Sequence, residues 1–318
     1  MRWFWLALLM CGALLTPRLY AQRTSALIGQ ALDKQLPQAE FKFSGTLPQA
    51  IAAFGDMTGV RIEADDAVYD ALPWGDLTTF HAEFKHQTLR QALTAICQKL
   101  GLQYDLQDQA VHLSPLPALQ RLGRRCTVEE LQALDLLGRT PLEAKELSLP
   151  AVKLLALIDD RLEKSPYAVE NRAFPPQNKT TLNVSRHSTL LDALEEISLQ
   201  TSATWYPWGQ TIVVLGKTDQ ICMQLSKRIS TRFNGEDVSD VLLELSKRSG
   251  VAFQIQPGAV QKIAPQFRTI RLVLDNATIQ QTLESISGFT GLAYTVTDDG
   301  VRIYTPLPAT AAATTQSN

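Results

Sequence analysis

One helical pattern occurs three times in this 318-residue chain, and its repetition constrains the fold more than any other feature. The copies read TLRQALTAICQKLGLQY from Thr88, TLLDALEEISLQTSATW from Thr189 and TIQQTLESISGFTGLAY from Thr278. Thr189 follows Thr88 by 101 positions and Thr278 follows it by 190, and both offsets hold without a gap as far as Leu113 of the first copy. Self-similarity over this length indicates that one structural unit is built three times.

Each copy begins with a threonine whose hydroxyl can accept a hydrogen bond from a backbone N–H in the first helical turn. Gly101 in the first copy and Gly291 in the third suit the left-handed end of that helix. Two strand-like segments follow, joined by QDQ in the first copy and by DDG in the third, which predicts a closing hairpin. Between these ends an apolar stripe follows helical spacing, formed in the first copy by Leu89, Ala92, Leu93, Ile96 and Leu100.

A strand, a helix and a second strand precede each of these segments. In the first copy they read FKFSG, LPQAIAAFGDMTG and VRIEA, and in the third ISTRFNG, DVSDVLLELSKRSG and VAFQI. The second copy diverges most, with AVKLLALIDDRLEKS as its helix. The sequence therefore predicts an α+β protein of three repeated small βαβ-βαββ domains, each with two helices packed on small β-sheets.

The first residues resemble a signal peptide. Arg2 precedes an apolar run of about twelve residues, which is too short to cross a bilayer, and Ala21 is a small residue suited to cleavage. The expected organisation is a signal peptide at 1–21, an amphipathic lead helix in 22–39, domains at 40–115, 147–216 and 227–306, a linker with a helix at 116–146, a linker at 217–226 and a disordered tail at 307–318. The lead and linker helices could dock on neighbouring domains or present an apolar face to a partner.

Composition narrows the class of protein. The chain is 45% hydrophobic and 19% charged, so it can bury cores. Cleavage after Ala21 would remove Arg2 and Arg18 and leave 28 basic against 32 acidic residues. Such a mild charge argues against nucleic-acid binding. No later segment reaches transmembrane length, so we expect a periplasmic or secreted chain that carries no transmembrane segment once it is mature.

Three cysteines follow the expected cleavage site. Cys97 lies where the other copies have serine, which predicts a small core residue. Cys126 and Cys222 each fall in a stretch that follows a repeat. An oxidising compartment would allow these two to form a disulfide, although their spacing alone does not establish the pairing.

Residues that could carry chemistry do not form a recognisable motif. His81, His86, His112 and His187 have no metal-ligand spacing. His86 and His187 occupy one repeat position before the helix, which favours a role in the local turn. We therefore expect no metal, no cofactor and no enzymatic activity.

Aromatic residues in the second copy are the best candidates for binding. In the segment TWYPWGQ, Trp205 aligns with tyrosines of the other copies and should be a core residue. Strand alternation turns Tyr206 and Trp208 to the opposite face, where the other copies have polar residues, so we expect both to be exposed. The alternative is that the linker helix or a neighbouring domain covers them. Trp74 in the loop YDALPWGDL is a further candidate, and Arg124–Arg125 is expected to be a solvated linker.

The repeat is similar to a known family. A helix with the pattern L-x-x-A-L, a Gly-Leu-x-Tyr strand and a closing hairpin resemble the short N-terminal domain of secretins and TonB-dependent receptors. The resemblance covers 41–115 and 227–306 well and 147–216 weakly, and the membrane barrel of those families is not part of this sequence.

The resemblance implies a non-enzymatic envelope protein that binds an outer-membrane barrel or a secretion component. Unpaired edges of its small sheets could accept a strand from that partner. The second copy is expected to be the binding repeat because it has diverged most. The alternative function is binding of peptidoglycan or carbohydrate through Tyr206, Trp208 and Trp74, since aromatic side chains stack on sugars.

Overall fold

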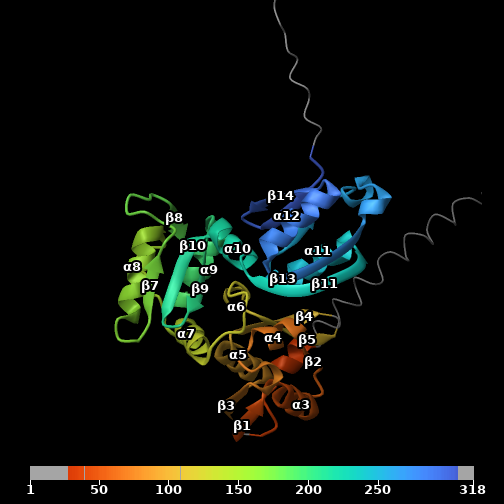
Figure 1. Cartoon of the computed structure of the whole chain (residues 1–318). Coiled ribbons are helices and arrows are strands. Elements are labelled where there is room, and N and C mark those ends of the chain that lie inside the picture. Colours follow the sequence, from red (N-terminus) through yellow and green to blue (C-terminus); the bar gives the residue numbers. More distant parts are fainter. Residues whose placement is uncertain (1–27, 39, 108, 307–318) are drawn as a thin grey trace, which may run out of the picture. The chain divides into compact units, whose positions relative to one another are not determined.

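The computed structural model describes residues 28–38, 40–107 and 109–306 (Figure 1). The signal peptide expected at 1–21 and the tail expected at 307–318 lie outside the described residues. Backbone contacts divide the chain into two compact units. The first runs up to Glu170 and also contains 179–196 and 206–213, and the second contains 171–178, 197–205 and the chain from Val214 onward.

The first repeat lies in the first unit. Its elements are β1 (Glu40–Thr46), α3 (Leu47–Thr58), β2 (Ile62–Ala64), α4 (Asp66–Ala71), η1 (Gly75–Leu77), β3 (Thr79–Lys85), α5 (Leu89–Leu100), β4 (Leu102–Gln107) and β5 (Ala110–Pro115). β1 and β3 form a two-stranded antiparallel ribbon. In the three-stranded sheet β2-β5-β4, β5 is central, with β2 parallel and β4 antiparallel to it.

The other two repeats have the same order of strands and of the two main helices, and they differ from the first in the connection between the second and third strands. The second consists of β6 (Ser148–Pro150), α8 (Ala151–Leu162), β7 (Ala168–Asn171), β8 (Thr181–Asn183), α9 (Leu190–Gln200), β9 (Ala203–Trp208) and β10 (Thr211–Gly216). The third, in the second unit, consists of β11 (Arg228–Asp237), α11 (Val238–Ser249), β12 (Phe253–Ile255), η2 (Val260–Lys262), η3 (Pro265–Phe267), β13 (Thr269–Thr278), α12 (Ile279–Thr290), β14 (Ala293–Thr297) and β15 (Gly300–Tyr304).

Strand pairing is identical in all three repeats. The first strand pairs with the third in a ribbon, and the second, fifth and fourth strands form a three-stranded sheet in that order. The predicted fold class, α+β with three repeated small domains, is confirmed.

The second helix of each repeat begins as the sequence predicts. The Thr88 hydroxyl accepts a hydrogen bond from the Gln91 N–H, and the Gln91 side chain accepts one from the Thr88 N–H. Thr278 forms the same reciprocal pair with Gln281. These capping boxes satisfy donors that the helix itself leaves free. Gly101 and Gly291, with φ of 63° and 73°, end the helices in the left-handed region.

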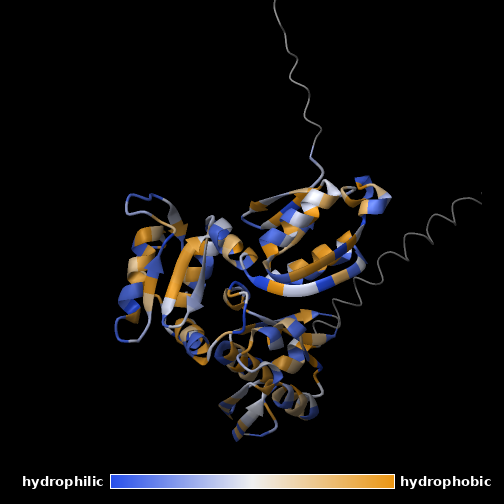
Figure 2. Cartoon of the chain, viewed as in Figure 1, coloured by the Kyte–Doolittle hydropathy of each residue, from blue (hydrophilic) through white to orange (hydrophobic). Residues whose placement is uncertain are grey.

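A cluster of phenylalanines forms part of the first core. Alternate residues of β1 and β3 face α3, so that Phe41 lies with its ring centroid 5.7 Å from Phe54 and 6.0 Å from Phe84. Phe43 packs on Phe80 at 5.1 Å. Figure 2 shows hydrophobic and hydrophilic residues interleaved along the elements, as expected when each element has one buried face.

Helices precede the second and third repeats. α7 (Val128–Arg139) lies in the expected 116–146 linker, and α10 (Lys217–Leu225) occupies most of the stretch 217–226, which was expected to be a linker. α7 docks on α5: the Leu134 side chain lies against Gly101, and Gly138 faces Gln98. Docking on a neighbouring element is thus one of the two roles expected for this helix, and it buries the apolar face of α7.

The segment that follows each leading helix meets the second helix of its repeat in the same way. The Leu89 N–H donates to the Lys34 carbonyl, the Leu190 N–H to the Thr140 carbonyl, and the Ile279 N–H to the Lys227 carbonyl. In the first repeat the described part of the lead helix, residues 28–32, comes just before this contact. The leading helix is therefore a recurrent element of the repeat.

None of the helices in the described part of the chain is both long and apolar enough to cross a membrane.

Gly300, at the turn of the last hairpin, offers a test of the third repeat. Its φ is +135°, and a Cβ there would clash with the Ala252 carbonyl oxygen, which accepts the Val301 N–H in the β12–β15 pairing. Gly258 also has a positive φ, +79°, but nothing lies within 4 Å of its Cβ position. We expect Gly300→Ala to lower the free energy of unfolding by about 1–3 kcal/mol more than Gly258→Ala in urea denaturation. Equal costs would show that the close approach to Ala252 contributes nothing.

Candidate binding surface

The aromatic residues of β9 differ in exposure. Trp208 is 50% exposed, whereas Tyr206 is only 3% exposed and Trp205 is fully buried. The expectation that Tyr206 is exposed is therefore wrong. Trp208 lies at the end of its strand, and the Tyr206 ring meets it edge to face with centroids 6.3 Å apart. Tyr206 therefore packs against the exposed Trp208 and does not itself present a surface for binding.

The sequence held a signal for this burial that strand alternation did not capture. β10 carries the uninterrupted run Ile212–Leu215, and all four of its residues are buried. The corresponding strands β5 and β15 place His112 and Arg302 between apolar neighbours. A continuous apolar strand indicates a sheet covered on both faces. Tyr206 is thus buried, as the alternative interpretation required.

Arg124 covers one side of Trp208. Its guanidinium carbon lies 4.3 Å from the centroid of the Trp208 ring, a cation–π contact. The same guanidinium binds both carboxylate oxygens of Glu130 through Nη1 at 3.0 Å and Nη2 at 2.6 Å. Arg124 is thus held in place by α7 and is not the solvated linker residue that the sequence suggested.

Glu130 is the centre of this network. Its side chain is fully buried, and it accepts hydrogen bonds from the Thr127 N–H at 2.8 Å and from the Gly209 N–H at 3.0 Å, besides those from Arg124. Gly209 is the turn of the β9–β10 hairpin, so one carboxylate connects the start of α7 with that hairpin. A buried carboxylate needs such partners because desolvation of an unpaired charge is costly.

The pKa of Glu130 reflects two opposing effects. Burial raises it, but the hydrogen bonds from Arg124, Gly209 and Thr127 and the charge of Arg124 lower it by more, so the pKa lies below its ordinary value. The charged carboxylate is therefore the form that the folded chain stabilises.

Trp74, the further candidate, is exposed, with 58% of its surface accessible. Trp74 follows α4, and its backbone N–H donates a hydrogen bond to the Thr78 hydroxyl at 3.0 Å. A Cβ at the next residue, Gly75, would lie 3.1 Å from Nη1 of Arg125. The consecutive residues Arg124 and Arg125 thus contact Trp208 and the backbone beside Trp74, respectively. We define Trp74, Arg124, Arg125 and Trp208 as the tryptophan–arginine surface.

Of the two cysteines that could form a disulfide, Cys126 is buried and Cys222 is exposed, and both are free thiols in this structure. Cys97 is buried, as expected of a core residue. Burial raises the pKa of the Cys126 thiol to about 12, with a further contribution from the charge of Glu130. A thiol with so high a pKa carries little thiolate at neutral pH and is a poor nucleophile.

The histidines His86 and His112 have local contacts or conformations within the first repeat. His86 has a φ of 50° and its counterpart in the third repeat, Asn276, a φ of 51°, which supports a role in the turn before the helix. His112 pairs with Glu63 across β5 and β2 at 3.4 Å. Within the described ranges, no group of three or more His, Cys, Asp or Glu side chains could hold a metal ion.

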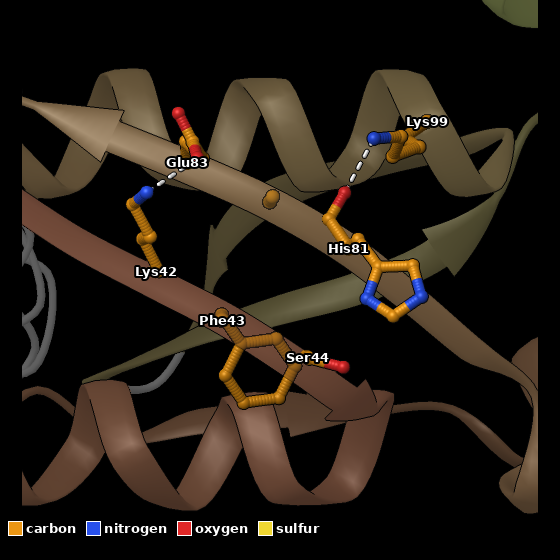
Figure 3. Close-up of a pocket in the computed structure, with 7 residues that line it drawn as sticks. Lys42, Phe43, Ser44, His81, Glu83 and Lys99 are labelled. Atoms are coloured by element: carbon orange, nitrogen blue, oxygen red, sulfur yellow. Dashed lines mark hydrogen bonds and ion pairs between the residues drawn. The ribbon is translucent and has the colours of Figure 1, made fainter.

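An open pocket of about 390 Å³ lies on the β1–β3 ribbon (Figure 3). Lys42 pairs there with Glu83 at 3.0 Å, and the Lys99 ammonium group donates to the His81 carbonyl oxygen. Its three charged side chains, those of Lys42, Glu83 and Lys99, therefore already have partners within the protein.

No protein-family model, no curated protein and no solved structure matches this chain.

The Glu130 network predicts a pH-dependent stability of the first unit. A carboxyl whose pKa is lowered by folding stabilises the fold above its unfolded pKa, about 4.3, and this contribution is lost as the pH falls through the lower folded value. We expect Glu130→Gln to reduce the free energy of unfolding by roughly 1–3 kcal/mol at neutral pH and by less below pH ~4. Glu129→Gln, at an exposed neighbouring position, is the control. Urea denaturation across this pH range measures both, and a pH-independent difference would contradict the assignment.

Proposed function

We propose that this is an exported, non-enzymatic protein of the cell envelope, periplasmic or secreted, whose repeats bind a protein partner. The partner would be an outer-membrane barrel or a component of a secretion or TonB-type transport and signalling system. The observation that supports this most is that one topology is built three times with different residues on its exposed surfaces. Repetition of a stable scaffold with varied surfaces suits protein recognition.

Two further features support protein binding. The ribbons β1–β3, β6–β8 and β11–β13 each have only two strands in the described part of the chain, so each has edges that could pair with a partner strand. The tryptophan–arginine surface combines exposed Trp74 and Trp208 with arginines, the residue types that most often dominate binding at protein interfaces.

A second candidate function is binding of peptidoglycan or another carbohydrate. Trp74 and Trp208 favour it because exposed indole rings can stack on sugars. Tyr206 no longer contributes to this candidate because it is buried.

Crosslinking of the tagged, exported chain in its native envelope distinguishes these two functions. We expect recovery of an outer-membrane barrel or secretion component, and a drop of about tenfold or more in that recovery for Trp74→Ala/Trp208→Ala, because loss of anchoring tryptophans typically costs over 1 kcal/mol each. Leu199→Ala removes an exposed apolar side chain elsewhere and is the matched control. Retention on purified cell-wall sacculi that depends on the two tryptophans, with no protein recovered, would favour carbohydrate binding instead.

A further inference from the structure

The ribbons of the first and third repeats differ on the face that is turned away from the helices. In the first repeat this face carries charges that neutralise one another. Lys42 pairs with Glu83 at 3.0 Å (Figure 3). Lys85 lies 4.0 Å from Glu40 and 3.9 Å from Glu83. Such a face has little unbalanced charge to offer a partner.

The third repeat lacks this neutralisation. Val273 stands 190 positions after Glu83, opposite Arg232, which corresponds to Lys42. Val273 is 64% exposed, and Arg271 lies diagonally across from Arg232 next to it. Among the residues that the structure describes, neither arginine forms an ion pair, and the nearest acid along the strand, Asp275, bonds to Ser230.

A second exchange makes the same region more apolar. Phe289 stands where the first repeat has Lys99, whose ammonium group reaches the His81 carbonyl. Arg271 corresponds to His81, so Phe289, which is exposed, replaces a lysine on the helix beside this strand. We call Arg232, Arg271, Val273 and Phe289 the basic ribbon face.

An acidic surface, complementary in charge to the basic ribbon face, lies in the first repeat in the segment that connects β2 to β3 in the sequence. Asp66, Asp70 and Asp76 are exposed there, and in the described chain none of them forms an ion pair. Two apolar side chains in the same segment are also exposed. In the sequence Trp74 lies between Asp70 and Asp76, and Leu77 follows Asp76. The guanidinium of Arg125 beside Gly75 offsets part of this negative charge. We call Asp66, Asp70, Trp74, Asp76 and Leu77 the acidic loop.

We propose that the chain associates with itself, the basic ribbon face of one copy binding the acidic loop of another. Carboxylates of Asp70 and Asp76 would pair with Arg232 and Arg271, and Trp74 and Leu77 would cover Val273. Two different patches meet in such a contact, so each copy keeps one free patch and the association is head to tail. This inference does not depend on the proposed function.

Sedimentation velocity of the purified chain over a range of concentrations tests the proposal. We expect the average sedimentation coefficient to rise with concentration at about 50 mM salt. The rise should be weaker at about 500 mM, where the Debye length shrinks to about 4 Å. A chain that stays monomeric at every concentration would overturn the proposal, whether an external partner or the chain itself covers the two patches.

Three variants identify the surfaces. Val273→Glu recreates the acid of the first repeat beside Arg232 and should lower the association constant about fivefold or more. Asp70→Asn/Asp76→Asn should do the same from the other side. Lys42→Glu, on the ribbon of the first repeat, should leave association unchanged. Circular dichroism checks that each variant is folded.

Charge reversal provides the strongest test. Arg232→Glu/Arg271→Glu should abolish association, and adding Asp70→Arg/Asp76→Arg in the same chain should restore it because the two patches again have opposite charges. An equimolar mixture of Val273→Glu with Asp70→Asn/Asp76→Asn should form dimers in preference to larger species, since each variant keeps one intact patch and one weakened patch. Association that none of these changes alters would overturn the assignment.

Discussion

Each repeat depends on a backbone hydrogen bond at the start of its second helix. Leu89, Leu190 and Ile279 are fully buried at the first helical turn, so water cannot reach N–H groups that the helix leaves free. In each case a carbonyl of the preceding segment accepts that N–H, over 3.2, 2.9 and 3.1 Å respectively. The leading segment therefore supplies an acceptor for an N–H that the helix leaves free, and this contact recurs in every repeat.

The three repeats share one topology but differ in how deeply their three-stranded sheets are buried. In the second repeat the strands β9 and β10 are buried on both faces, whereas the edge strand β7 is mostly exposed, and Glu130 of α7 connects to the β9–β10 hairpin through Gly209. In the first and third repeats the outer position of the central strand carries His112 or Arg302, which keeps that face polar. The outward-facing positions of β10 are apolar, which suits their burial. The buried carboxylate of Glu130 beside this hairpin is compensated by the charge of Arg124.

The two-stranded ribbons of the first and third repeats also differ in their surface charge. The ribbon of the first repeat balances its lysines with glutamates, while that of the third has lost the acid opposite Arg232. Two exchanges at equivalent positions, Glu83 to Val273 and His81 to Arg271, replace a charge-balanced surface by one with free arginines and an exposed apolar side chain. Repeats diverge most easily in this way because outward-facing residues of a strand do not affect the core.

The sequence by itself determined the repeated fold, because helix caps such as Thr88 and the apolar stripe behind it are local or periodic signals. It also indicated that Trp74 and Trp208 are exposed. It did not determine the burial of Tyr206, the role of Arg124 or the helix at 217–225, because these depend on residues far apart in the chain. Only tertiary structure brings Glu130 to Gly209 and Arg124 to Trp208, since neither contact has a spacing that a linear pattern can reveal.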